Sequence, residues 1–370
     1  MMNEDPKSDI IETLRQYGLK NPYRIKKLIE DAIRFNKLNL SDLIVFTEAA
    51  SKNYVVTPII AAMAGGKVYA ITIDSPYGKA KDIGEFTYIF AEFCGVRNKI
   101  DVVFEKNRKF VEKANIVTNL GFVRPINKKF IEMMNDNTVI SLMCEAWEYR
   151  EGDIDLKECK LKNIPILATN EDAKGLDVFD YVGPLCIKML FELEIEVYKS
   201  KIVVVSRDKF GRVIERYLKN IGAEVYLIEN LKSKSNRIFL KNCDALVIAD
   251  YTSTDTFIGD QYSQITAKEL TNFSKKISVV QFTGDVDTCE LDKHNITYLP
   301  NKRIGKFRMG MTFSELGPKP VIDLHCAGLK VGEIFSRAKI NVGSIEKARK
   351  ISIKNPLIQE IKQNNQLIKK

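Results

Sequence analysis

The chain has 370 residues, of which 45% are hydrophobic and 28% are charged. A chain of this length and composition can bury about three quarters of its unfolded surface, and its length predicts two domains more readily than one. No apolar run approaches the roughly 20 residues that cross a bilayer, and the polar start of the sequence is unlike a secretory or transit signal. We therefore expect a cytoplasmic protein without a membrane partner.

The formal net charge is +9, but the lysines and arginines are spread along the chain, and the basic clusters at residues 301–308 and 362–370 are short. A nucleic-acid groove needs sustained clustering with interleaved aromatic residues. The seven cysteines are widely spaced, and with only two histidines no pair has the spacing of metal ligands. We expect reduced thiols, no metal and no nucleic-acid partner.

Helical periodicity runs through residues 9–38 and is interrupted at Gly18 and Pro22, which predicts two helices before the first sheet. Strand candidates then follow, with helical stretches between most of them. This alternation predicts parallel βαβ units and an open, doubly wound sheet. The candidate strands are residues 43–46, 68–73, 101–104, 115–118, 138–143 and 164–168.

A largely apolar helix at residues 184–194 links this sheet to a second one, whose predicted strands are residues 201–205, 224–228, 245–249, 277–282 and 297–299. The sequence therefore predicts an α/β protein with two doubly wound, Rossmann-like domains and a cleft between them. The expected divisions are 1–40 for the N-terminal helices, 41–195 with 335–370 for a substrate domain, and 196–334 for a dinucleotide-binding domain.

The ends of the predicted strands are the first places to look for a site. In an open parallel sheet the ligand lies beyond the carboxyl ends of the strands, and in a two-domain protein it usually lies between the domains. The strand-end candidates are residues 47–51, 74–78, 144–147, 168–171, 249–252 and 282–285.

Residues 206–211, with the sequence SRDKFG, lie between a predicted strand and a predicted helix, where a G-x-G-x-x-G dinucleotide loop belongs. Ser206 and Asp208 replace the two glycines that allow a tight turn and a close approach to pyrophosphate, whereas Gly211 keeps the glycine that packs helix against strand. The helix start still offers amides to a phosphate, but Asp208 puts a carboxylate near it. Glu229 stands where an acidic residue accepts the ribose hydroxyls. The segment is either an NAD site or an α/β unit that no longer binds nucleotide.

Several segments together resemble the D-isomer-specific 2-hydroxyacid dehydrogenase superfamily, whose members include formate and glycerate dehydrogenases. Residues 152–156 and 162–167 are similar to the family's Asn-Ile-Asp-Leu segment and Gly-Ile-Pro-Val strand, and residues 182–185 begin a similar helix. Residues 244–249 and 252–258 resemble the strand and loop against the nicotinamide ribose. The resemblance covers roughly residues 115–335 and implies NAD as cofactor and a homodimer. The expected cofactor contacts are Ser206, Lys209, Phe210, Gly211, Glu229, Tyr251, Thr252 and Thr283.

Residues 322–328, with the sequence IDLHCAG, look like the family's Thr-Pro-His-x-Ala-Gly segment, which would make His325 the catalytic acid and base. Such a histidine protonates a carbonyl oxygen as hydride arrives, and its ordinary pKa near 6.5 suits both directions. Glu315 lies near the sequence position of the family's glutamate, which pairs with the imidazole of the catalytic histidine. The alternatives are a core histidine satisfied by the backbone and an ordinary surface turn at Glu315.

The family's catalytic arginine is missing, because Thr283 stands in its place. Threonine cannot grip a carboxylate with two donors, so an ordinary 2-oxo acid is not the expected substrate. Candidate replacements are Lys302, Arg303 or Arg308 in the loop before Glu315, or Arg150 from the first domain. Trp147, the only tryptophan, is flanked by acidic residues and indicates a larger or cationic substrate, unless it packs between the domains.

Three functions remain open. The first is an NAD-dependent oxidoreductase that acts on a small hydroxy or oxo substrate. The second is a protein that keeps this scaffold and binds a ligand or partner without hydride chemistry. The third is an enzyme that uses S-adenosylmethionine or S-adenosylhomocysteine, with residues 43–74 as the adenosyl-binding β-α-β unit and Asp74 at its strand end.

Overall fold

The computed structural model describes residues 6–361, which divide into two compact units. Of the described residues, unit 1 comprises 6–178 and 317–361, and unit 2 is Phe179–Leu316. The boundaries differ from the expected ones. The N-terminal helices share the core of unit 1, the helix expected as a linker packs on a helix of unit 2, and the chain after Gly317 continues as one long helix of unit 1.

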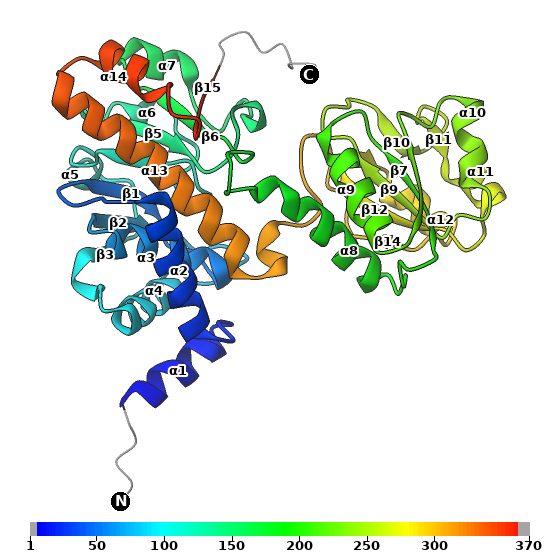
Figure 1. Ribbon diagram of the computed structural model, residues 1–370, viewed down its shortest axis with the longest axis horizontal. Helices are drawn as coiled ribbons and strands as arrows, with labels where there is room; N and C mark the ends of the chain where they lie inside the picture. The colour runs from blue at the N-terminus through cyan, green and yellow to red at the C-terminus, as the bar shows by residue number, and fades with distance from the viewer. Residues whose placement is uncertain (1–5, 362–370) are drawn as a thin grey trace, which may run out of the picture. The chain divides into compact units, whose positions relative to one another are not determined.

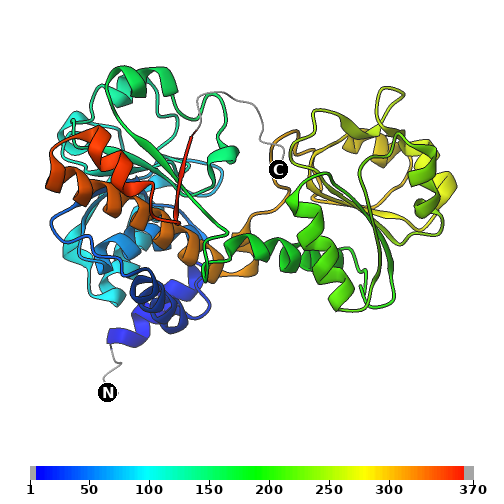
Figure 2. The ribbon, with the colours of Figure 1, turned by 45° about the horizontal axis from the view of Figure 1, so that its top comes forward.

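Unit 1 is built on a seven-stranded sheet with the order β15-β6-β5-β4-β1-β2-β3. All of its strands run parallel except β15, the red strand of Figure 2, which is antiparallel to β6. Without β15 this is the 3-2-1-4-5-6 order of dinucleotide-binding sheets. The strands are β1 (Ile44–Glu48), β2 (Lys67–Ile71), β3 (Ile100–Val103), β4 (Ile116–Thr118), β5 (Val139–Leu142), β6 (Ile166–Thr169) and β15 (Ile358–Glu360).

Helices cover both faces of this sheet, which explains why its strands are apolar at successive positions. On β1, Val45 packs into one core and its neighbour Phe46 into another, and both are fully buried. Figure 1 shows α2, α3 and α13 together on one face. The helices before Val178 are α1 (Pro6–Gln16), α2 (Pro22–Asn36), α3 (Val56–Met63), α4 (Ala80–Cys94), α5 (Arg108–Val111), α6 (Lys128–Ile131) and α7 (Leu156–Leu161).

The long helix α13 (Pro318–Val342) runs across the sheet of unit 1 and is followed by α14 (Ile345–Ser352). It begins with two prolines in its first turn, where the missing amides cost no hydrogen bond, and ends at Gly343 in the left-handed conformation. Gly328 and Gly332 let it approach the strands closely: a Cβ at these positions would lie 2.2 Å from Met143 Sδ and 2.7 Å from Ile116 Cγ2.

Unit 2 contains a parallel sheet with the order β14-β12-β9-β7-β8, the flavodoxin-like arrangement, and a small sheet, β11-β10-β13, that the sequence did not predict. The strands are β7 (Lys201–Val205), β8 (Glu224–Ile228), β9 (Ala245–Ala249), β10 (Thr256–Gly259), β11 (Ile265–Thr266), β12 (Ser278–Thr283), β13 (Asp285–Val286) and β14 (Tyr298–Leu299). The helices are α8 (Val182–Glu192), α9 (Lys209–Asn220), α10 (Lys234–Arg237), α11 (Ala267–Phe273) and α12 (Thr288–Lys293). The two doubly wound α/β units agree with the predicted fold class.

Within residues 6–361 no helix is long and apolar enough to cross a membrane. Over the same range, no three His, Cys, Asp or Glu side chains are grouped as metal ligands would be.

Candidate functional sites

The carboxyl ends of β7, β8, β9 and β12 lie at one edge of the unit 2 sheet, because these strands are parallel neighbours. Four of the predicted cofactor residues therefore stand side by side at strand ends: Ser206, Glu229, Tyr251 and Thr283. Glu229 is exposed, whereas the other three are buried. These strand ends therefore lie at one edge of the sheet, as the sequence predicted.

Gly211 provides the close helix-to-strand packing that the third glycine of a dinucleotide loop provides. A Cβ at this position would lie 2.3 Å from Ser206 Cβ and 2.9 Å from Leu227 Cδ1. Helix α9 can therefore approach β7 and β8 only because residue 211 has no side chain.

The start of α9 is bonded to oxygen atoms of the chain itself. Asp208 caps the helix, and its Oδ1 accepts a hydrogen bond from the amide of Phe210 at 2.9 Å. The Ser206 hydroxyl accepts from the amides of Asp208 and Gly211, each at 3.2 Å. These are the amides that a cofactor phosphate would use at such a helix start.

Side chains also connect β7 to β9, where the strand order of the sheet reverses and where open α/β sheets bind their ligands. Asp208 Oδ2 accepts from the amide of Tyr251 at 2.8 Å, and Arg207 Nε donates to Asp250 Oδ2 at 2.7 Å. Asp250 is fully buried and also accepts from the amides of Thr252 and Ser253. Burial, with the nearby Asp250 carboxylate, raises the pKa of Asp208.

These contacts do not fit the pyrophosphate of NAD, because a carboxylate lies where the phosphate would bind. Phe210 is buried and stacks on Tyr251, with 5.9 Å between the ring centroids, and Lys209 Nζ lies 3.6 Å from the centre of the Phe179 ring. The Thr252 hydroxyl donates to Asp250. Thr283 is buried, and its hydroxyl has no hydrogen-bond partner among the described residues. Glu229 is exposed directly after β8.

His325 lies in the third turn of α13 rather than on a loop, and it is 3% exposed. Its Nδ1 lies 2.6 Å from Oγ1 of Thr57 on α3, and its ring centroid lies 6.0 Å from that of Tyr54. Burial lowers the pKa of His325 to about 3, so the ring is neutral near pH 7. Glu315 is exposed in the short turn Phe313–Leu316 of unit 2, whereas His325 belongs to unit 1.

A second set of polar groups lies at the carboxyl edge of unit 1. Glu48 ends β1 and is buried, and its Oε2 accepts from the amide of Phe122 at 3.0 Å. Burial raises the pKa of Glu48 to about 7, against the lowering effect of that hydrogen bond. The hydroxyls of Thr47 and Thr118 lie 2.9 Å apart across β1 and β4, at the point where the strand order of this sheet reverses.

Two further strands of the unit 1 sheet, β5 and β6, are also followed by buried carboxyl groups. Glu145 follows β5 and accepts a hydrogen bond from the indole of Trp147, and Glu171 follows β6. Trp147 and Arg150 are half-buried in this unit, whereas Arg308 is exposed in unit 2. The predicted substrate residues therefore divide between the units.

Glu48, Glu145 and Glu171 were not among the residues predicted for a site, although each lies in one of the predicted strand-end segments. The signal that could have found them is a carboxylate at the end of an otherwise apolar strand.

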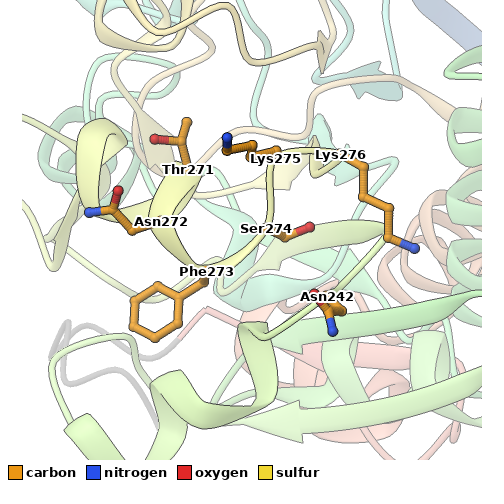
Figure 3. Close-up of a pocket in the computed structure, with 7 residues that line it drawn as sticks. All are labelled: Asn242, Thr271, Asn272, Phe273, Ser274, Lys275 and Lys276. Atoms are coloured by element: carbon orange, nitrogen blue, oxygen red, sulfur yellow. The ribbon is translucent and has the colours of Figure 1, made fainter.

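A hollow of about 500 Å³ opens at the other edge of the unit 2 sheet (Figure 3). It is lined by Asn242 and residues 271–276, which precede β9 and β12. No predicted site residue lines it, and it lies at the amino ends of the strands, away from the edge where parallel sheets bind ligands.

No protein-family model and no curated protein matches the chain. Among solved structures it is similar to a dipicolinate synthase chain from Bacillus halodurans, with 10% identity over 78% of this chain and 96% of that chain and a TM-score of 0.49. A putative D-3-phosphoglycerate dehydrogenase from Ralstonia solanacearum has 10% identity over 84% and 99% of the chains and a TM-score of 0.43. An NAD-dependent formate dehydrogenase from Staphylococcus aureus, solved with NAD, has 8% identity over 81% and 96% and a TM-score of 0.39.

These similar structures are of the D-isomer 2-hydroxyacid dehydrogenase family, which the sequence segments also resemble. At such low identities and TM-scores the likeness assigns no activity to this chain. We therefore infer the cofactor from the contacts of the chain's own residues.

Proposed function

We propose that the protein is an enzyme that uses S-adenosylmethionine, a cofactor with a positive charge and no phosphate, at the carboxyl edge of unit 1. The observation that supports this most is the buried Glu48 at the end of β1, beside the reversal point between β1 and β4. Ligands of open α/β sheets bind at such reversal points.

The chemistry of this edge favours a cation. Burying an ionised carboxyl group is costly, and Glu48, Glu145 and Glu171 are all at least 95% buried. A sulfonium or ammonium group near Glu48 would favour the ionised form of its carboxyl group. The loop between β1 and α3 contains no glycine, so it lacks the feature by which a backbone closely approaches a pyrophosphate. When bound, the cofactor would supply a group for transfer, and Glu48 and Glu145 are the residues that would hold its charged end.

Thermal stability with each nucleotide tests this proposal. A ligand at 100 times its dissociation constant stabilises a fold by about 2.7 kcal/mol. We expect S-adenosylmethionine and S-adenosylhomocysteine to raise the melting temperature, and NAD and NADH to leave it unchanged. Glu48→Gln should reduce the rise, and Glu315→Gln, which changes an exposed carboxylate, should not. A rise with NADH and none with the adenosyl ligands would contradict the proposal.

An NAD-dependent oxidoreductase is the second candidate, and the geometry of Gly211 and Glu229 favours it. In this case the cofactor would lie at the carboxyl edge of unit 2, and Glu229 would select NAD over NADP, because a 2′-phosphate would meet its carboxylate. His325 and Glu315 would transfer the proton to or from a small hydroxy or oxo substrate. The same melting experiment separates the two candidates.

A further inference from the structure

We infer that the carboxylate of Asp208 takes the place of a cofactor phosphate within this chain, so that unit 2 excludes pyrophosphate-containing cofactors at the reversal point between β7 and β9. The exclusion belongs to unit 2 alone and does not depend on the ligand proposed for unit 1.

Two of the hydrogen-bond donors at the start of α9 already have partners within the chain. A helix start leaves its first amides without partners inside the helix, and a bound phosphate normally accepts from them. Here the amides of Phe210 and Gly211 donate to Asp208 Oδ1 and Ser206 Oγ. A phosphate would first have to displace both side chains.

The space beside these donors is filled as well. Glycines at the first two positions of a dinucleotide loop allow backbone and pyrophosphate to come close. In this chain the Ser206 side chain lies directly against the start of α9, with its Cβ 2.3 Å from where a Cβ of residue 211 would be. The Ser206 side chain therefore stands where the first glycine of a dinucleotide loop would have none.

The charge of the loop also opposes a phosphate. Of the two cations in residues 206–211, Arg207 is paired with the buried Asp250, and Lys209 Nζ lies 3.6 Å from the centre of the Phe179 ring. The buried carboxylate of Asp208 would lie beside an incoming phosphate. Like charges placed together in a buried site disfavour the charged forms.

An aspartate at a helix start is common, and a plain cap would explain the bond from Phe210 by itself. The second carboxylate oxygen distinguishes Asp208 from a plain helix cap. Its Oδ2 accepts from the amide of Tyr251, which belongs to the strand end on the other side of the reversal point. One carboxylate therefore bonds the helix start and the neighbouring strand end together, across the place where a ligand of this sheet would enter.

The test is a gain of binding in the full-length protein, measured by titrating NADH and following its fluorescence, with inorganic pyrophosphate as competitor. Ser206→Gly combined with Asp208→Gly should bind NADH at least tenfold more tightly than the wild type, and pyrophosphate should displace it. Asp208→Asn keeps a capping oxygen and removes the charge, so it should fold and show a smaller gain even if the double variant does not fold.

Asp287→Asn is the matched control, because Asp287 caps α12 in the same unit and bonds the amides of Cys289 and Glu290. It should leave NADH binding as in the wild type. Two results would overturn the inference: wild-type protein that binds NADH as tightly as the variants, or variants that fold and gain no affinity. Stabilisation of the double variant by S-adenosylmethionine should remain, so failure here is distinguishable from failure of the function proposed for unit 1.

Discussion

Nδ1 of His325 and Oγ1 of Thr57 lie 2.6 Å apart, and both side chains are buried between α13 and α3 of unit 1. The bond joins the last long helix of the chain to one of its first. This bond gives His325 a structural role. Substitution of His325 can therefore be tested for a loss of stability separately from a loss of proton transfer.

Acidification should destabilise the wild type more than His325→Gln. The pKa of the folded ring is lowered to about 3, whereas the unfolded ring takes up a proton near pH 6.5. The stability from this group is therefore complete above pH 6.5 and is lost as the pH falls toward 3. Between pH 7 and pH 5 the wild type should lose up to roughly 2 kcal/mol more than the variant, which urea titrations at both pH values would measure. Unchanged stability, with turnover lowered roughly 100-fold to 10,000-fold, would instead indicate a catalytic acid and base.

Glu48→Gln should have the opposite pH dependence. Burial raises the pKa of Glu48 to about 7, from an ordinary value of 4.5, so the fold favours the protonated form. That stability is complete below pH 4.5 and is lost as the pH rises through 7. The stability of the variant relative to the wild type should therefore increase from pH 5 to pH 8, by up to roughly 3 kcal/mol. Glu315→Gln is the exposed control, and parallel curves for wild type and Glu48→Gln would show that the carboxyl group is not desolvated.

Gly211→Ala should destabilise the protein by about 1–3 kcal/mol, because the new methyl group would lie 2.3 Å from Ser206 Cβ and 2.9 Å from Leu227 Cδ1. Gly84→Ala is the matched control in α4, since a Cβ there meets its nearest atom at an ordinary 3.4 Å. It should be neutral or stabilising, because alanine is the better helix former. Equal effects of the two changes in thermal unfolding would contradict the packing role of Gly211.

We also propose a homodimer, on the basis of the family resemblance and the frequency of two-fold symmetric assemblies. Light scattering at micromolar concentration should give twice the chain mass of 42.2 kDa. A mass of one chain would contradict it.

The strands of both parallel sheets could be predicted to within a few residues, because β-branched runs bounded by turn residues mark buried strands. Helix α13 could not be predicted from the sequence. Its Pro318 and Pro320 and its Gly328 and Gly332 are residues that usually interrupt helices, and only the sheet beneath explains the two glycines. The strand β15 has three residues and is held by pairing with β6, which is distant in sequence.

The positions of the candidate site residues in the fold could be predicted in part. The strand-end rule located both carboxyl edges, and Gly211 has the packing role expected of it. Glu48 accepts its hydrogen bond from a backbone amide 74 positions away. The second hydrogen bond of Asp208 comes from a strand end 43 positions away. Such partners follow from the tertiary structure, and a local motif does not contain them.

The insertion of unit 2 between the two parts of unit 1 has a consequence for synthesis. Ile322, Cys326 and Leu329 of α13 belong to the same core as Ile116 and Val139, yet they leave the ribosome more than 170 residues later. The apolar side chains of the unit 1 sheet that α13 covers therefore stay exposed until α13 has been synthesised. Unit 2 is one continuous segment and can fold before that. A nascent chain that stops at residue 316 would contain all of unit 2 but would lack α13 and α14, which cover part of the unit 1 core.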